Sequence, residues 1–264
     1  MEKGVPIRSL SRGLAVLQAV NRGGSLSMME IARASNVPYP TACRLVQTLL
    51  FEGLIEQEPS RKRYRPTALV QTLAHGFQGD AGIVQTSRPH IVQLTRKLMW
   101  PISLSTHVGS NMVIRDSTHS LTTLTFNQYF PGYSIPILEC ASGLVYLANM
   151  PAEERAGILD SLKRLPDRMP MHVLRMIEEE TLMDDVRRQG FASRGNNHFT
   201  RNPGKTSSIA VPIFERGHVA GALTLAFFSS AMRMDDAIQQ FVGPLKEAAA
   251  AITSELSDEV QAAE

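Results

Sequence analysis

Apolar residues recur at helical spacing near the start of the chain. Residues 9–21 carry leucine or valine at positions 10, 14, 17 and 20. Residues 42–50 place apolar side chains at i, i+3, i+4, i+7 and i+8, which is typical of one buried helix face. Between these two helices, Ser27 precedes Glu30 by three positions and predicts a capping box that begins another helix.

Local signals place the ends of the third helix and predict a hairpin after it. Pro40 suits the first position of that helix, where a missing N–H costs nothing, and Gly53 ends it. Two extended runs follow at 54–58 and 63–66, joined by Pro59-Ser60-Arg61-Lys62. Three helices followed by a basic-tipped hairpin predict a winged helix-turn-helix, which is a compact DNA-binding fold.

The outward face of the third helix is polar and the hairpin tip is basic. Arg44 can bind guanine with two hydrogen bonds and Gln47 can address adenine, while cations at the tip suit phosphates or the adjacent minor groove. A helical subdomain that only packs against the rest of the chain is the alternative, and these two features favour DNA binding. The predicted DNA contacts are Ser11, Arg12, Ser27, Tyr39, Thr41, Arg44, Gln47, Thr48, Arg61, Lys62 and Arg63.

Charge is distributed unevenly along the chain. The 264 residues carry a formal net charge of +2, which by itself says little. Residues 1–66 hold ten basic and five acidic residues, a net +5, and the remainder holds 17 basic and 20 acidic residues, a net −3. A basic module attached to a mildly acidic body is expected when nucleic-acid contact is confined to one domain.

Composition excludes several classes of protein. The length suits two modest domains, and the two cysteines, Cys43 and Cys140, offer neither a disulfide framework nor a zinc site. No apolar run approaches a membrane span and no signal peptide is evident, so we expect a cytoplasmic protein without a membrane partner. The seven histidines form no HExxH motif, and no GxSxG frames a serine nucleophile. We therefore expect no metal, no cofactor and no enzyme activity.

The remainder of the chain mixes helical and extended periodicities. A helix running from Pro66-Thr67 to Phe77 ends in a glycine-rich joint, which predicts a linker between two domains. Turn-bounded β-branched runs then alternate with helical stretches, and this predicts an α+β domain with an antiparallel sheet and flanking helices. The predicted domains are 1–66, 67–82 and 83–264. The predicted strands are 102–108, 112–115, 121–126, 135–138, 208–214 and 219–228, and the predicted helices are 83–99, 141–149, 151–163, 171–189 and 235–256.

Four segments in the same order resemble the IclR-type transcriptional regulators. They are SLSRGLAVLQAV at 9–20, TACRLVQTL at 41–49, GYSIP at 132–136 with ASG at 141–143, and SIAVPIF at 208–214 with GAL at 221–223. The resemblance covers nearly the whole chain. It implies a winged helix-turn-helix dimerised partly through the linker helix, a GAF-like C-terminal domain that binds a small effector, and homodimers or homotetramers on palindromic double-stranded operators.

The resemblance also implies an effector site. Members that sense carboxylic acids hold the ligand between the loop after the Pro136-type strand and the terminal hairpin. Where many relatives carry an acidic residue, this chain has Arg194, and the loop 195–204 is longer than usual. That loop suits a larger, aromatic carboxylate, although Arg194 and Arg201 as solvated loop charges are the alternative. The implied effector residues are Ile135, Ala141, Ser142, Arg194, Ser208, Thr224 and Ala226.

Residues 202–208, Asn-Pro-Gly-Lys-Thr-Ser-Ser, further resemble regulators of phenylpropionate catabolism, which act as activators and would engage RNA polymerase. The expected function is therefore a ligand-responsive transcriptional regulator of a catabolic operon. An enzyme acting on a small organic acid, with an accessory DNA-binding domain, is the alternative, and the lack of a nucleophile–base pair argues against it. A purely structural DNA-binding protein is a further alternative, but the nearly 200 residues outside the DNA-binding domain would then have no function.

Overall fold

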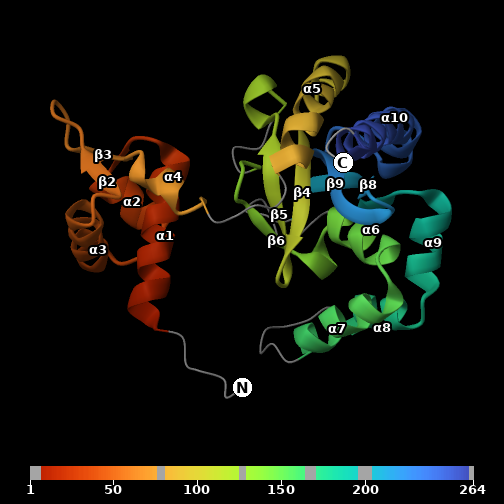
Figure 1. Ribbon diagram of the computed structural model, residues 1–264, viewed down its shortest axis with the longest axis horizontal. Helices are drawn as coiled ribbons and strands as arrows, with labels where there is room; N and C mark the ends of the chain where they lie inside the picture. Colours follow the sequence, from red (N-terminus) through yellow and green to blue (C-terminus); the bar gives the residue numbers. More distant parts are fainter. Residues whose placement is uncertain (1–6, 76–80, 125–128, 164–170, 196–203, 262–264) are drawn as a thin grey trace. The chain divides into compact units, whose positions relative to one another are not determined.

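The chain forms two compact units, Met1–Gly79 and Asp80–Glu264 (Figure 1). The predicted boundaries at 66 and 82, with a separate linker, remain a prediction. None of the described helices is long and apolar enough to cross a membrane. The structure is a computed structural model, and it describes residues 7–75, 81–124, 129–163, 171–195 and 204–261.

The first unit contains the predicted three helices and hairpin, and that prediction is confirmed. A further short strand, β1, pairs with β3, so the sheet has three strands in the order β1-β3-β2. The predicted capping box is present, because the Ser27 hydroxyl accepts from the Glu30 amide at 3.4 Å and the Glu30 carboxylate accepts from the Ser27 amide at 2.8 Å. The elements are α1 (Arg8–Gly23), β1 (Leu26–Ser27), α2 (Met28–Ala34), α3 (Tyr39–Phe51), β2 (Ile55–Gln57), β3 (Arg63–Pro66) and α4 (Leu69–Thr72).

Three details of this unit differ from the prediction. Pro40 is the second residue of α3, because the helix already begins at Tyr39. Leu10 and Leu14 of the predicted apolar stripe on α1 are 61 % and 52 % exposed. Leu17 and Val20 of that stripe are buried as predicted, together with Val16 and Ala19. The linker helix is a single turn, α4, and residues 76–80 of the predicted linker lie outside the described part of the chain.

The second unit contains a six-stranded antiparallel sheet in the order β6-β5-β4-β9-β8-β7. Its elements are α5 (Ala81–Leu98), β4 (Ile102–Val108), β5 (Asn111–Ser117), η1 (His119–Leu121), β6 (Ser134–Pro136), η2 (Ile137–Glu139), α6 (Ala141–Asn149), α7 (Ala152–Lys163), α8 (Met171–Glu178), α9 (Thr181–Gln189), β7 (Ala192–Arg194), β8 (Thr206–Glu215), β9 (His218–Phe228) and α10 (Met234–Gln261). The predicted α+β class is confirmed.

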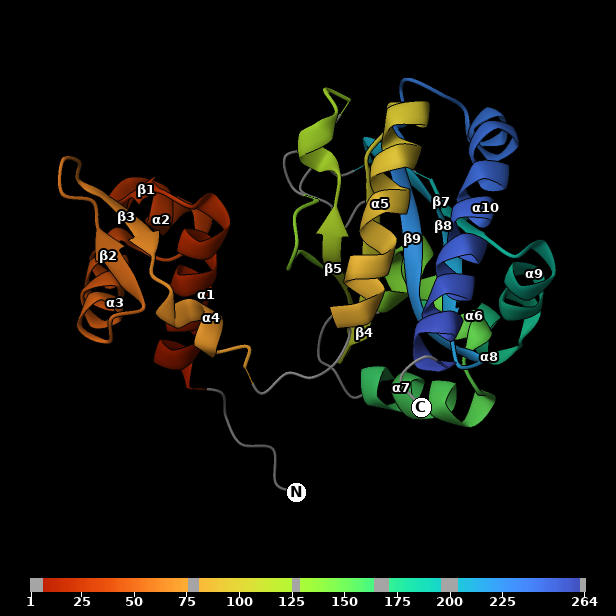
Figure 2. The ribbon, with the colours of Figure 1, turned by 45° about the horizontal axis from the view of Figure 1, so that its top comes forward.

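The two faces of this sheet have different compositions. Figure 2 shows α5 and α10 side by side across one face, with α6 on the other. Leucine, isoleucine and phenylalanine from β4, β8 and β9 face α5 and α10 in one core cluster. The alternate residues face α6 because successive side chains of a strand point to opposite faces. Several of these are small or carry a hydroxyl group: Ser103, Ser105, Ser208, Ala210, Ala222 and Thr224.

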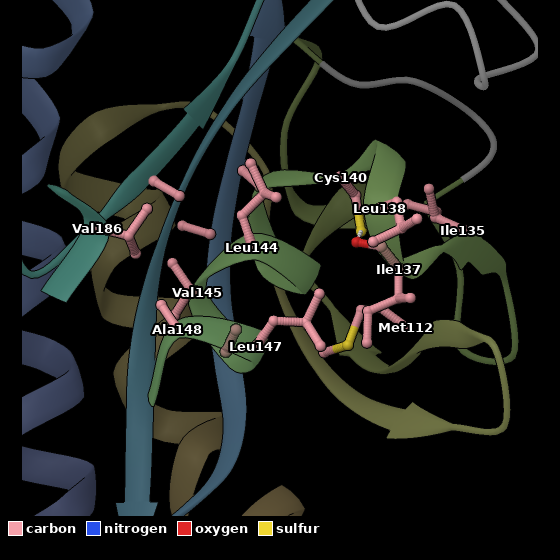
Figure 3. Close-up of a cluster of buried hydrophobic side chains, with 14 of the residues drawn as sticks. Met112, Ile135, Ile137, Leu138, Cys140, Leu144, Val145, Leu147, Ala148 and Val186 are labelled. Atoms are coloured by element: carbon pink, nitrogen blue, oxygen red, sulfur yellow. Dashed lines mark hydrogen bonds between the residues drawn. The ribbon is translucent and has the colours of Figure 1, made fainter. Parts of the chain in front are cut away.

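The apolar residues of α6 pack against this second face. Figure 3 shows Leu144, Val145 and Ala148 of α6 directed toward the strands, while Ile135, Leu138 and Cys140 lie at the other end of the cluster. Gly143 is required in α6, because an added Cβ would lie 1.8 Å from the carbonyl oxygen of Ile137. The absence of a side chain at Gly143 thus lets the start of α6 pack directly against the preceding turn.

Three predictions for this unit were wrong in detail. The predicted helix 171–189 is broken into α8 and α9, and Glu180 between them has a left-handed φ of 61°. The predicted strand 121–126 is absent over its described part, residues 121–124, where Thr122 instead donates to the carbonyl of Met99. Such side-chain bonds to the backbone compete with strand pairing. The predicted strand 135–138 ends at Pro136, because residues 137–139 form the 3-10 helix η2. Strand β7 was not predicted.

Candidate DNA-reading surface and effector cavity

The outward face of α3 is polar, as the sequence predicts. Ala42, Val46 and Leu49 are buried on one side of the helix. Arg44, Gln47 and Thr48 are exposed on the other side and Thr41 is half-buried. Tyr39, at the start of the helix, is 47 % exposed. The side chains of Arg44 and Gln47 are therefore exposed and can address base edges, whereas the Thr48 hydroxyl donates to the Arg44 carbonyl at 3.1 Å.

A hollow of about 580 Å³ lies between α1 and α3. It brings Arg12 together with four of the five predicted contacts on α3, and Tyr39 does not line it. The sequence reasoning missed Ser9 and Phe51, although Phe51 lies seven residues after Arg44 and so on the same helix face. The hollow is lined by Ser9, Arg12, Thr41, Arg44, Leu45, Gln47, Thr48 and Phe51.

The three basic residues of the hairpin between β2 and β3 have two different roles. Arg61 and Lys62 are exposed. Arg63 is instead bound at the base of the hairpin, where its guanidinium donates to the Ser25 carbonyl at 2.8 Å and lies 2.9 Å from the carboxylate of Glu30. Arg63 therefore fixes the hairpin to the start of α2, and only Arg61 and Lys62 are presented at the tip.

Two further predicted contacts also have structural roles. The Ser27 amide lowers the pKa of the Glu30 carboxylate by donating to it, and Arg63 lowers it further. The hydroxyl of Ser27 is used in the capping box. The hydroxyl of Ser11 is 3.4 Å from the carbonyl of Ile7 within α1. These groups support the fold at the edge of the reading surface.

A small enclosed cavity lies between the sheet and the start of α6 in the second unit. It leaves about 10 Å³ open to the centre of a water molecule, which is about the minimum that a single water needs. Six hydroxyl-bearing residues converge on it, from three strands, from α6 and from the segment before β6, together with apolar side chains. The lining is Ser103, Ser105, Met112, Ile114, Tyr129, Ile135, Cys140, Ser142, Ser208 and Thr224.

Two of these hydroxyl groups have no hydrogen-bond partner within the described structure. They are Ser105 Oγ and Thr224 Oγ1, and both atoms are buried. Of their neighbours, the Ser103 hydroxyl lies 3.5 Å from the Thr224 carbonyl oxygen and the Ser142 hydroxyl lies 3.3 Å from Cys140 Sγ. Buried polar groups are almost always paired in native proteins, so an exception calls for an explanation.

The cavity is polar but uncharged at neutral pH. Burial raises the pKa of the Cys140 thiol, and burial also raises the pKa of Tyr129 to about 12. Both groups are therefore protonated near pH 7. The start of α6 adds backbone N–H groups, which favour a negative ligand group. The arrangement can hold a small molecule by hydrogen bonds from hydroxyls and amides.

The cavity brings together four of the seven residues predicted to bind an effector. Ile135, Ser142, Ser208 and Thr224 line it. Ala141 is buried beside this lining, and Ala226 is paired with Ser208 across β8 and β9.

Arg194 does not line the cavity. Its guanidinium donates to the Leu138 carbonyl at 2.8 Å and lies 3.6 Å from the Glu139 carboxylate. It is half-buried, so it is not the solvated charge of the alternative interpretation. Arg201 and most of the long loop, residues 196–203, lie outside the described part of the chain.

The sequence reasoning missed several lining residues. Strand alternation in 102–108 could have indicated Ser103 and Ser105, because they alternate with apolar Ile102 and Leu104. The other missed residues are Met112, Ile114, Tyr129 and Cys140. Within the described residues, no group of three or more His, Cys, Asp or Glu side chains is placed to bind a metal ion.

A winged helix-turn-helix with an exposed polar third helix, followed by a sheet domain with a hydroxyl-lined cavity, defines a ligand-responsive DNA-binding regulator. The model of the IclR helix-turn-helix domain matches residues 9–59, and that of the bacterial transcriptional regulator IclR C-terminal domain matches residues 77–254. The chain belongs to the IclR family of bacterial transcriptional regulators. Its members are transcriptional regulators and not enzymes.

Curated relatives and solved structures agree with this assignment. The chain is 24% identical to the HTH-type transcriptional regulator XynR of Escherichia coli, over 95% of this chain and 97% of that protein. It is 25% identical to TsaQ1/TsaQ2 of Comamonas testosteroni, over 60% of this chain and 57% of that protein, so this match spans little more than half of the relative's length.

Two solved structures share the fold. The Thermotoga maritima IclR superposes with a TM-score of 0.62 at 22% identity, covering 94% of this chain and 98% of that one. An IclR homolog from Microbacterium hydrocarbonoxydans, complexed with 4-hydroxybenzoate, gives 0.61 at 21% identity over the same shares.

Proposed function

We propose that this protein binds a palindromic operator through α3 and the hairpin tip, and controls a catabolic operon in response to a small carboxylic acid. The observation that carries the DNA-binding part is the exposed face of α3, where Arg44, Gln47 and Thr48 lie opposite the buried Ala42, Val46 and Leu49. These side chains supply the donors and acceptors that base edges require.

Replacement of Arg44 by Ala tests the reading role of α3. The variant should bind a selected operator more weakly and lose discrimination at one base position, because an arginine–guanine pair contributes about 1–3 kcal/mol. Replacement of both Arg61 and Lys62 by Ala should instead weaken binding to all duplexes and flatten the salt dependence. An unchanged footprint in the first variant and an unchanged salt slope in the second would contradict the proposal.

The effector part of the proposal rests on the cavity beside α6. Two buried hydroxyls without partners and the amide groups at the start of α6 are suited to a carboxylate. The cavity is much smaller than an organic acid, so binding requires movement of its walls. Because the ligand would then favour one arrangement of the protein over another, its binding would shift the equilibrium between DNA-binding states.

A thermal-shift screen of small carboxylic acids tests the effector part. We take 4-hydroxybenzoate as the first probe, because an aromatic acid suits the proposal and a structurally similar homolog was solved with it. A ligand at 100 times its Kd adds about 2.7 kcal/mol of stability. Ser142→Val should abolish the shift while leaving operator binding by the free protein intact. A ligand shift that survives this substitution would place the site elsewhere.

Homodimers or homotetramers are part of the same proposal. Leu10 and Leu14 on α1 and Ile7 just before it are 61 %, 52 % and 67 % exposed, and such an apolar surface supports self-association. Light scattering should show at least a dimer, and a monomer at micromolar concentration would contradict this part. Transcription in vitro from the selected operator tests whether the protein activates RNA polymerase and whether it belongs to the aromatic-acid subgroup.

A further inference from the structure

Phe51 is the most exposed of the large apolar residues in the described structure, at 88 %. It lies at the end of α3, three residues after Thr48, four after Gln47 and seven after Arg44. Residues at these spacings share one helix face. The aromatic ring therefore projects from the middle of the polar face, opposite the buried Ala42, Val46 and Leu49 of the same helix.

The surroundings of Phe51 indicate which partner suits it. The ring borders the hollow between α1 and α3, which is also lined by Arg12 and Arg44. An exposed aromatic ring beside two guanidinium groups matches a surface that is anionic and also offers small apolar groups. The major groove of DNA is such a surface, because phosphates flank it and each thymine presents a C5-methyl group within it.

We infer that Phe51 is a specificity-determining residue that contacts a thymine methyl group in the operator. This inference rests on the proposed DNA reading by α3. Seven residues correspond to about 10 Å along a helix axis, which is about three base pairs at 3.4 Å each. If α3 follows the groove, the contacted thymine lies about three base pairs from the base that Arg44 reads.

Uracil-substituted operators test the contact directly, because deoxyuridine differs from thymidine only by the missing methyl group. A duplex is first selected from a random library with the full-length protein, and each thymine is then replaced in turn. The unaltered protein should lose about fourfold in affinity at one thymine in each half-site, which corresponds to about 0.8 kcal/mol for a methyl group. Phe51→Ala should bind the parent duplex more weakly, and its affinity should not change when that one thymine is replaced.

Two variants serve as controls. Phe51→Leu keeps an apolar side chain and should retain the sensitivity to the methyl group. Met29→Ala removes another exposed apolar residue of the same unit, 57 % exposed on α2, and should leave the substitution profile unchanged. Because Phe51 is exposed, its replacement should not alter the circular dichroism or the melting temperature.

Three results would overturn the inference. Equal losses for the unaltered protein and Phe51→Ala at every thymine would show that the ring does not read a methyl group. Unchanged operator affinity in Phe51→Ala would assign the ring to another partner, such as a second copy of the chain. Failure of the unaltered protein to select any duplex would refute the proposed DNA reading itself, and is thereby distinguished from the first two outcomes.

Discussion

The unpaired hydroxyl of Thr224 predicts that a conservative substitution will stabilise this protein. Thr224 lies on β9 and faces the cavity beside α6, where its buried Oγ1 has no hydrogen-bond partner within the described structure. Valine has the same shape but replaces the hydroxyl with a methyl group. Thr224→Val should therefore remove a desolvation cost without leaving a void.

The size of this effect follows from the cost of an unpaired buried group. Leaving a buried donor or acceptor without a partner costs about 1–3 kcal/mol. Allowing for some relaxation, we expect a gain of about 1–2 kcal/mol in the free energy of unfolding of the second unit. For a domain of this size each kcal/mol raises the melting temperature by about 2–4 °C, so the expected rise is about 2–8 °C.

Thr118→Val is a matched control, for which we expect the opposite change in the free energy of unfolding. The Thr118 hydroxyl is fully buried, accepts from the Ile102 amide at 2.8 Å and lies 2.6 Å from the Thr95 hydroxyl. The same change of hydroxyl to methyl leaves these partners unpaired. We expect a loss of about 1–3 kcal/mol.

Urea unfolding and calorimetry of the full chain measure both variants. A lower melting temperature for Thr224→Val would refute the reasoning, because it would show that the hydroxyl contributes to folding. The same variant should respond less to an effector that stabilises the unaltered protein. A more stable protein that no longer senses its ligand would show that the hydroxyl is retained for function at the expense of stability.

Three further predictions concern folding. The Ser27 amide lowers the pKa of Glu30, so this stabilisation is full above the ordinary glutamate pKa of about 4.3 and is lost as the pH falls through the lowered pKa. Glu30→Gln should flatten that acid limb in pH-dependent urea titrations. Gly143→Ala should destabilise the second unit by about 3 kcal/mol in calorimetry, because its Cβ would meet the Ile137 carbonyl at 1.8 Å. Arg155→Ala should lower the free energy of unfolding in urea titrations by about 3 kcal/mol, because this buried guanidinium donates to the Leu147 carbonyl of α6, to the Met150 carbonyl after it and to the Glu180 carboxylate. An unchanged free energy of unfolding in either variant would contradict its prediction.

The sequence determined the DNA-binding unit almost completely. Its signals are local: the Ser27–Glu30 capping box, the helical periodicity of 42–50 and the basic turn between two short strands lie within a few residues of each other. Local spacing decides which face of a helix is buried, so the polar face of α3 could be predicted. The same reasoning overlooked Phe51, because an aromatic residue at helical spacing usually indicates core.

Only the tertiary structure decided which polar groups are available and which residues form the cavity. The sequence predicted Arg63 as a DNA contact and Arg194 as an effector residue, but each guanidinium donates to a distant carbonyl group, that of Ser25 and that of Leu138. The cavity joins hydroxyl groups from β4, α6, β8 and β9, which are separated by up to about 120 positions. Strand register and the docking of α6 bring them together, and neither is encoded in the spacing of neighbouring residues.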